Sequence, residues 1–264
     1  MSGIGGVKMD MALDVRTSVS SVAAQLDARP VKKRIALVVL ATDHTTELDF
    51  ARMCDPKEIG IYANRIDYQN PGTRENLLAT GPRLTKAAAQ ILPDEAVDVI
   101  AYSCTAASVL LGNEAVGVYL NAGKPDTPFV TPSSAALAAF KALGAQKISV
   151  LTPYSENITN EVLAYFSANG PQIVSANCLG VDDDREIARL SEDTIIEAAC
   201  AAMDPESDAL FLSCTGLRAA VCIDRIEART GKPVVSSNQA MIWRCLREVG
   251  SITDLPGYGR LFLH

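Results

Sequence analysis

Histidine, basic residues and long apolar runs are all scarce in this chain, and each scarcity argues against a class of function. Only His44 and the terminal His264 occur among 264 residues, too few for a zinc site built on histidine. Lys and Arg number 24 against 31 Asp and Glu, and no segment carries the basic stripe that phosphate contacts need. No apolar run approaches the roughly 20 residues that span a bilayer. We therefore expect no metal, no nucleic acid and no membrane among its partners.

Disulfides are also not expected, although cysteine itself is present. The seven cysteines are an odd number, and no two of them have CxxC spacing. Residues 1–30 lack the charged-then-apolar layout of a secretory signal, and we interpret them as an N-terminal extension. We therefore expect a cytoplasmic protein with free thiols.

Strand-like and helix-like segments alternate from residue 34 onward, which predicts an α/β fold with parallel sheets. Each strand-like segment is an apolar run rich in β-branched residues, as in buried parallel strands. The expected strands are 34–40, 58–66, 97–104, 127–132, 147–154, 172–180, 208–214 and 233–237. The expected helices are 76–92, 106–112, 133–144 (capped by Ser133 or Ser134), 155–170, 185–203 (with a possible break near Ser191), 217–231 and 238–250.

The two halves of this series resemble each other. "DVIAYSCTAASVL" (98–110) and "DALFLSCTGLRAA" (208–220) both place Ser-Cys-Thr at the end of the third strand of their half. From the start of each half, 70 positions lead to Cys104 and 67 to Cys214. The repeat predicts two Rossmann-like lobes related by a pseudo-twofold axis.

We expect the first lobe to comprise residues 31–131, with 236–264 returning to it, and the second to comprise 132–235. Ligands of open parallel sheets bind outside the carboxyl ends of the strands. Cys104 and Cys214 are therefore expected to face a shared cleft between the lobes.

Two facing thiols suit chemistry on both faces of one small acid. A helix start after each cysteine stabilises a thiolate, and neighbouring backbone amides can hold a carboxylate. One thiolate can take a proton from carbon while the other thiol returns one to the opposite face, which is racemisation without a metal or cofactor. Alternatively a thiolate adds to an alkene, the new single bond rotates, and elimination gives the other geometric isomer. The amides expected to bind the carboxylate are those of Thr105, Ala106, Thr215 and Gly216.

The other cysteines lack a repeated setting, and a buried cysteine is more often a small hydrophobe than a catalyst. We interpret them as structural: Cys54, Cys178, Cys200, Cys222 and Cys245.

Five segments in order, "YSCTAASVLLG", "VTPSSAALAAFKALGAQKISVLTPY", "LGVDDDREIARLS", "LFLSCTGLRAA" and "PVVSSNQAMIW", carry a family resemblance. With them the chain resembles the aspartate/glutamate racemase superfamily, in the branch of maleate cis–trans isomerases and arylmalonate decarboxylases. Within the branch, "VKKRIALVVLATDHTTELDF" and "ILPDEAVDVIAYSCTAAS" most resemble the ectoine-utilisation A proteins.

This resemblance implies an active site between two lobes, no cofactor, and a small carboxylate substrate. It also implies that Cys104 is the nucleophile, that Cys214 is a general acid, and that Tyr154 orients the substrate. Oligomers are common in the superfamily, so a homo-oligomer is possible. The amides of Thr105 and Thr215 correspond to those that bind carboxylate oxygens.

Two positions depart from the family pattern. Asp184 stands where the family has an asparagine that contacts a carboxylate, and His44 stands for an asparagine of the first loop. Asp184 would repel a second carboxylate unless it is protonated or paired, whereas His44 could be a cation at that end. A substrate with a cationic group, such as an ectoine-derived diamino acid, fits better than plain maleate. Alternatively Asp184 caps the helix starting at Arg185, and His44 is an ordinary loop residue.

The leading hypothesis is thus a cofactor-independent isomerase or racemase. Decarboxylation, with Cys214 alone protonating an enediolate, is an alternative, but the decarboxylases of the branch have a small residue in place of Cys104. A catalytically idle protein that binds a small acid is a second alternative. A nicotinamide enzyme is not expected, because no GxGxxG follows the first strand. Ser237 and Asn238 are expected mainly to cap the last helix.

Overall fold

The computed structural model describes residues 17–252 and 254–264, and the chain divides into two compact units, residues 1–30 and 31–264. The described part of the first unit, residues 17–30, contains no helix or strand. The second unit holds the α/β fold and the candidate site.

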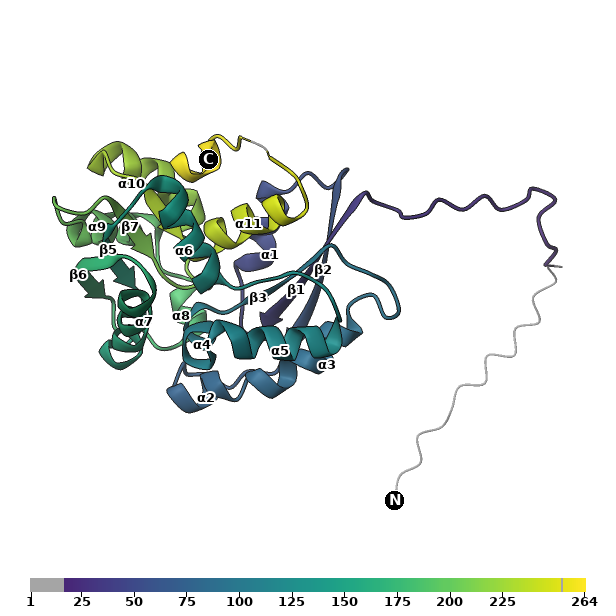
Figure 1. The fold of residues 1–264 in the computed structure, drawn as a ribbon, viewed down its shortest axis with the longest axis horizontal. Helices are drawn as coiled ribbons and strands as arrows, with labels where there is room; N and C mark the ends of the chain where they lie inside the picture. Colours follow the sequence, from purple (N-terminus) through teal and green to yellow (C-terminus); the bar gives the residue numbers. More distant parts are fainter. Residues whose placement is uncertain (1–16, 253) are drawn as a thin grey trace, which may run out of the picture. The chain divides into compact units, whose positions relative to one another are not determined.

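Two four-stranded sheets, all parallel, form the frame of residues 31–264 (Figure 1). The strand orders are β2-β1-β3-β4 and β6-β5-β7-β8, so the second sheet repeats the first. This confirms the predicted α/β fold with two lobes. The strands of the first sheet are β1 (Lys33–Leu40), β2 (Ile59–Ile66), β3 (Val99–Ser103) and β4 (Phe129–Val130). Those of the second are β5 (Lys147–Thr152), β6 (Gln172–Cys178), β7 (Ala209–Leu212) and β8 (Val234–Ser236).

The inner strands are buried on both faces, which explains their unbroken apolar sequences. All residues of β3 and β7 are buried, as are those of β1 after its first residue. Parallel strands covered by helices on both faces have this character because neither face meets water.

Two expected helices are each divided in the structure. The segment 76–92 forms α2 (Arg74–Leu78) and α3 (Gly81–Gln90), because Pro82 lies in the first turn of α3, where its missing N–H costs nothing. The segment 185–203 forms α8 (Asp184–Ile187) and α9 (Glu192–Ala202). Ser191 caps α9 by accepting a hydrogen bond from the Thr194 amide, so the expected break lies there.

Two α-helices were not expected, α1 (Thr46–Met53) and α5 (Asn113–Gly123). The glycines of α5 disfavour a helix locally, but they permit close packing. A Cβ on Gly117 would lie 2.6 Å from the Phe129 ring, and one on Gly123 would collide with the Thr85 carbonyl oxygen. Tertiary packing therefore outweighs local propensity in α5.

The remaining helices lie in expected segments, except the short η2 (Arg260–Leu263), which was not expected. They are α4 (Thr105–Leu111), α6 (Pro132–Leu143), α7 (Glu156–Asn169), η1 (Ala220–Cys222), α10 (Ile223–Thr230), α11 (Ser237–Glu248) and η2. In the segment 217–231 the helical part begins only at Ala220. The cap of α6 is Thr131, in a reciprocal capping box with Ser134, rather than Ser133 or Ser134 as predicted. No helix in the described part of the chain is long and apolar enough to cross a membrane.

Helix α11 connects the halves of the fold. It packs against α6 and also contacts β3, α1 and β8, and its residues 237–243 are all buried. The predicted lobe boundaries, which return 236–264 to the first lobe, stay a prediction.

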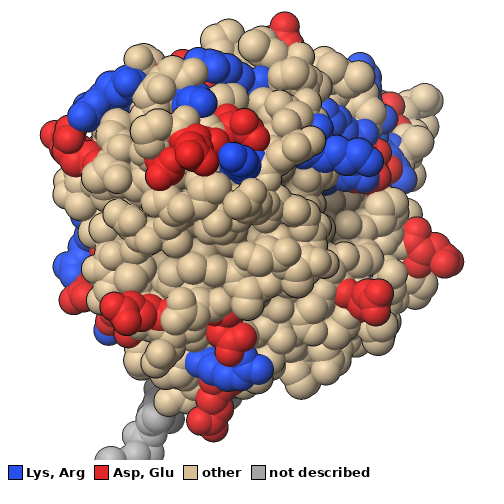
Figure 2. Space-filling view, turned by 60° about the vertical axis from the view of Figure 1, so that its left-hand side comes forward, with Lys and Arg blue, Asp and Glu red and all other residues tan. Residues whose placement is uncertain are grey.

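Charges of both signs are mixed on the molecular surface. On the face in Figure 2, groups of Lys and Arg lie beside Asp and Glu around a broad area without charged residues. Ion pairs account for part of this mixing, as where Arg225 contacts Glu192 and Asp193 and Arg229 contacts Glu197.

Candidate active site

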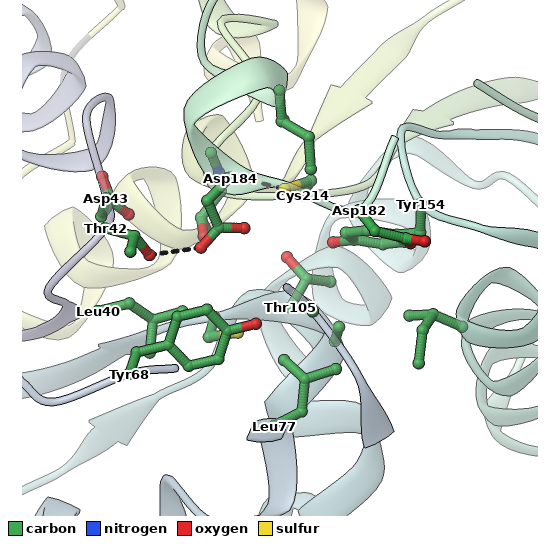
Figure 3. Close-up of a pocket in the computed structure, with 17 residues that line it drawn as sticks. Leu40, Thr42, Asp43, Tyr68, Leu77, Thr105, Tyr154, Asp182, Asp184 and Cys214 are labelled. Atoms are coloured by element: carbon green, nitrogen blue, oxygen red, sulfur yellow. Dashed lines mark hydrogen bonds between the residues drawn. The ribbon is translucent and has the colours of Figure 1, made fainter. Parts of the chain in front are cut away.

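Cys104 and Cys214 line one pocket (Figure 3). Cys104 follows β3 and is the N-cap of α4, and Cys214 follows the equivalent strand β7. The carboxyl ends of β1, β2, β5 and β6 also lead into residues that line this pocket. The structure therefore brings the repeated Ser-Cys-Thr segments together, as expected from their positions.

Each sulfur accepts a hydrogen bond from a backbone amide. Cys104 Sγ accepts from the Ala107 amide at 3.4 Å, and Cys214 Sγ accepts from the Gly216 amide at 3.3 Å. Cys214 has a φ of 103°, a backbone conformation that residues other than glycine rarely adopt. The loop that carries Cys214 is thus strained, and the strain falls on a candidate reactive residue.

Both thiols are buried, and burial raises the pKa of Cys104 far above its ordinary value and that of Cys214 to about 12. The Ala107 amide lowers the pKa of Cys104, but by less than burial raises it, and Asp184 raises both values. Burial therefore opposes the stabilisation of a thiolate that the amides beside each cysteine provide.

A tyrosine hydroxyl lies near each sulfur. Tyr154, which follows β5, lowers the pKa of Cys214 through a side-chain hydrogen bond, and Tyr102 lies within hydrogen-bond range of Cys104. The single hydroxyl proton of Tyr102 is donated to Thr80 Oγ1 at 2.9 Å, so only Tyr154 has a proton to donate to its sulfur. Sequence reasoning found Tyr154 but missed Tyr102. The sequence signal for Tyr102 was its position two residues before Cys104, because residues two apart on a strand point to the same face of the sheet.

The other predicted site residues divide into those inside the pocket and one outside it. Thr105, Ala106, Thr215, Gly216 and Asp184 line the pocket.

His44 does not lie in this pocket, contrary to the prediction. It is exposed and borders a separate hollow beside Asp183 and Arg185. The reason is the preceding residue: Asp43 Oδ1 accepts hydrogen bonds from the Thr45 and Thr46 amides, and this tight turn leaves His44 on the outside.

Asp184 is not the cap of α8, so that alternative is wrong. The cap is Asp183, whose carboxylate accepts from the Arg185 amide at 2.8 Å. Asp184 Oδ2 accepts a hydrogen bond from Thr42 Oγ1 at 2.5 Å. Burial raises the pKa of Asp184 above its ordinary value, and the nearby Asp43 adds to this effect.

Sequence reasoning missed most of the pocket wall. Tyr68 follows β2 and points its hydroxyl toward the middle of the pocket (Figure 3). The other missed residues are Leu40, Thr42, Asp43, Gly72, Leu77, Ile158, Asp182 and Ile187. Several follow strand ends, which was the available signal. The described residues that line the pocket include no Lys, Arg or His, and the described residues contain no cluster of three or more His, Cys, Asp or Glu that could hold a metal ion.

Buried hydroxyl and amide groups fasten the two cysteine loops to α11. Ser237 Oγ accepts hydrogen bonds from Thr105 Oγ1 at 2.8 Å and from the Cys214 amide at 3.0 Å. Asn238 Nδ2 donates to the Thr215 carbonyl oxygen at 2.9 Å. The helix cap itself is Ser236, so Ser237 and Asn238 join the loops rather than cap α11 as predicted.

Asp49, which accepts a hydrogen bond from Asn238, gives this network a pH dependence. Burial raises the pKa of Asp49 from 3.8 to about 6. Because the folded pKa is the higher one, ionised Asp49 costs stability above about pH 6, and the cost disappears as the pH falls toward 3.8. Asp49→Asn, which keeps an acceptor for Asn238, should raise the free energy of unfolding by about 1–2 kcal/mol near pH 8 and by less near pH 4. Urea unfolding of both proteins across this range measures the difference, and a gain that does not change with pH would contradict the assignment.

Comparison with known proteins agrees with this architecture. Residues 82–262 match the family model described as arylmalonate decarboxylase. The arylmalonate decarboxylase of Bordetella bronchiseptica is 37% identical over 140 residues, which are 51% of this chain and 58% of that protein. The match thus spans a little over half the length of that relative.

Maleate isomerases match over nearly the whole chain. That of Geobacillus stearothermophilus is 25% identical over 242 residues, covering 86% of this chain and 96% of the relative. Among solved structures, a Nocardia farcinica maleate cis–trans isomerase mutant with a covalently bound succinylcysteine intermediate has a TM-score of 0.79 and 26% identity. That similarity covers 87% of this chain and 98% of the other. By its match over residues 82–262, this chain belongs to the arylmalonate decarboxylase family.

Proposed function

We propose that this protein is a cofactor-independent isomerase or racemase of a small carboxylate, with Cys104 and Cys214 acting on opposite faces of the substrate. The observation that carries the proposal is the placement of two cysteines after equivalent strands of two equivalent sheets, opening into one pocket. Maleate isomerase relatives that match nearly the whole chain support the isomerase class.

Racemisation needs one thiolate and one thiol. The thiolate takes the proton from the carbon beside the carboxylate, and the electron pair of the broken C–H bond delocalises into that carboxylate. The opposite thiol then donates its proton to the other face, so the two sulfurs exchange protonation states and nothing else is consumed. The amides of Ala107 and Gly216, which donate to Cys104 and Cys214, stabilise whichever sulfur is ionised.

Geometric isomerisation uses the same groups differently. The Cys104 thiolate forms a C–S bond to an alkene carbon, and the π pair moves toward the adjacent carboxylate. Rotation about the resulting single bond and loss of the thiolate give the other isomer. The succinylcysteine intermediate named for the Nocardia relative is of this covalent kind.

Decarboxylation is the second candidate, because the family model and the Bordetella relative carry that name. It needs only one thiol to protonate the enediolate left when carbon dioxide departs, and in this chain that thiol is Cys214. The presence of Cys104 across the pocket favours isomerase or racemase chemistry.

The proposal includes finer points. Resemblance to the ectoine-utilisation A proteins supports a substrate from ectoine or hydroxyectoine breakdown, and we include a cytoplasmic location and a homo-oligomer in the proposal. Tyr154 and the amides of Thr105, Ala106 and Thr215 are the groups proposed to hold the substrate carboxylate. The Gly216 amide, the fourth one expected there, donates to Cys214 Sγ instead.

A screen in heavy water tests the proposed class. Small acids, including maleate, aspartate, ectoine-derived amino acids and arylmalonates, are incubated with the protein and followed by NMR. Isomerisation, or deuterium uptake at the carbon beside the carboxylate, is the expected result. Release of carbon dioxide alone would favour decarboxylation, and binding without any turnover would favour an idle acid-binding protein.

A further inference from the structure

Three carboxylates line the pocket, and their surroundings differ. Asp43 accepts three hydrogen bonds from Thr45 and Thr46 within its own turn. Asp182 is exposed, and its Oδ1 accepts from the Ser155 amide. Asp184 is largely buried and receives one hydrogen bond, from Thr42 to Oδ2. Asp43 thus holds its own turn together, and Asp182 joins the loop after β6 to the loop after β5.

The second oxygen of Asp184 faces the pocket. In Figure 3 one carboxylate oxygen meets Thr42, and the other points toward the middle of the group of lining residues. Within the described part of the chain, Asp184 Oδ1 has no hydrogen-bond donor. Its charge influences the pKa values of both Cys104 and Cys214, so it lies within electrostatic range of both sulfurs.

Among the described residues that line the pocket, no cation balances this carboxylate. The neighbouring Arg185 is engaged by Asp183, with Nε 2.9 Å from Oδ1. His44 lowers the pKa of Asp184 by less than the Thr42 hydrogen bond does, and it is itself exposed. A desolvated carboxylate without a cation is unfavourable in its ionised form, and a ligand that brings the cation removes this penalty.

Substrates with a second negative charge fit this end of the pocket poorly. A dicarboxylate would place its second carboxylate near Asp184 and Asp43, with no Lys, Arg or His among the described lining residues to offset the repulsion. A zwitterion avoids that cost, because its amine can pair with Asp184 while its carboxylate meets the uncharged donors beside the cysteines. Juxtaposed like charges and unpaired charges are the usual means by which a site rejects a ligand.

We propose that Asp184 Oδ1 binds the protonated amine of the substrate, so that the substrate class is a small amino acid. The inference rests on the proposed function, because it takes this pocket as the site of reaction. It also selects between the two isomerase mechanisms. An ammonium group on the carbon beside the carboxylate makes that C–H bond more acidic, and proton exchange between two thiols then inverts the carbon without any C–S bond.

Binding measured without turnover tests the proposal. The probes are matched sets that differ in one group: aspartate, malate and maleate; and 2-aminobutyrate with 2-hydroxybutyrate. Calorimetry is performed on the full chain carrying Cys214→Ser, so that no reaction obscures the heats. The amino member of each set should bind about 10- to 100-fold more tightly, as expected of a hydrogen bond to a charged group.

Asp184→Asn should abolish this preference, because the amide keeps the shape and the Thr42 contact but loses the charge. The matched control is Glu186→Gln, which removes the same charge from an exposed position on α8 and should keep the preference. Equal or tighter binding of malate or maleate by the parent protein would overturn the proposal. So would a preference that survives Asp184→Asn, or failure of every amino acid of the panel to bind.

The two proposals can fail separately. Suppose that binding is selective for amines and depends on Asp184, but the wild-type protein shows no deuterium uptake. This result would contradict the proposed isomerase activity and support the proposed amine-binding role of Asp184. Suppose instead that acids without an amine are turned over in a cysteine-dependent way and that amines are not bound preferentially. This result would support the proposed isomerase activity and overturn the proposed role of Asp184.

Discussion

Cys104→Ser is expected to lower the rate of racemisation or isomerisation by about 10³-fold, the usual contribution of a positioned acid–base group. Serine is a good N-cap, so its hydroxyl can replace the sulfur as acceptor for the Ala107 amide and preserve the start of α4. The hydroxyl is a far weaker acid than the thiol and does not supply an anion at neutral pH. Deuterium uptake and isomer interconversion, followed by NMR with the substrate found in the screen, measure the loss.

Two companion variants make this result specific. Cys214→Ser should cause a loss of similar size, whereas Cys178→Ser, at a partly exposed position of the edge strand β6 outside the pocket, should leave the rate unchanged. Decarboxylation that survives Cys104→Ser but not Cys214→Ser would establish the one-thiol mechanism. Wild-type rates in both Cys104→Ser and Cys214→Ser would exclude the cysteine pair.

Phe211→Ala is expected to lower the free energy of unfolding by about 3–5 kcal/mol, the range for removing a large aromatic side chain from a core. Phe211, in β7, is completely buried in a cluster with Phe140 of α6 and Phe166 of α7. The Phe140 and Phe211 rings meet edge to face, with centroids 5.7 Å apart. Because β7 leads directly to Cys214, a cavity here also loosens the frame of the site. Urea unfolding followed by circular dichroism measures the change.

Phe211→Leu is the control, since it keeps most of the apolar volume and loses the aromatic contacts. We expect it to cost clearly less than the alanine variant. A loss below about 1 kcal/mol for Phe211→Ala would mean that the cluster collapses around the gap or contributes little.

The parts of the fold that could be predicted from the sequence are those that local sequence patterns determine. The strands β1, β3, β5 and β7 are apolar runs bounded by turn residues, and their repetition predicted two equivalent sheets. The cysteines could be placed because each directly follows such a strand. The carboxyl ends of parallel strands meet at one edge of the sheet, where ligands bind. A residue that directly follows such a strand can therefore be predicted to lie at the pocket.

The parts that could not be predicted depend on contacts between distant segments. The hydrogen bond between Thr42 and Asp184 joins residues 142 positions apart, and nothing near either residue indicates the other. His44 was misplaced for a similar reason, because the turn made by Asp43 decides which side of the loop faces the pocket. The raised pKa values of both thiols follow from burial, which a strand-end position does not reveal.

The backbone of Cys214 ties the activity of this site to its stability. With a φ of 103°, the residue occupies a conformation that costs a side chain of order 1–3 kcal/mol and costs glycine almost nothing. In directed evolution for heat resistance alone, Cys214→Gly would therefore be a favourable step that discards the thiol. Selection for higher thermal stability therefore has to include a screen for turnover at every round. Stabilising substitutions outside the loop that follows β7 carry the least risk to activity.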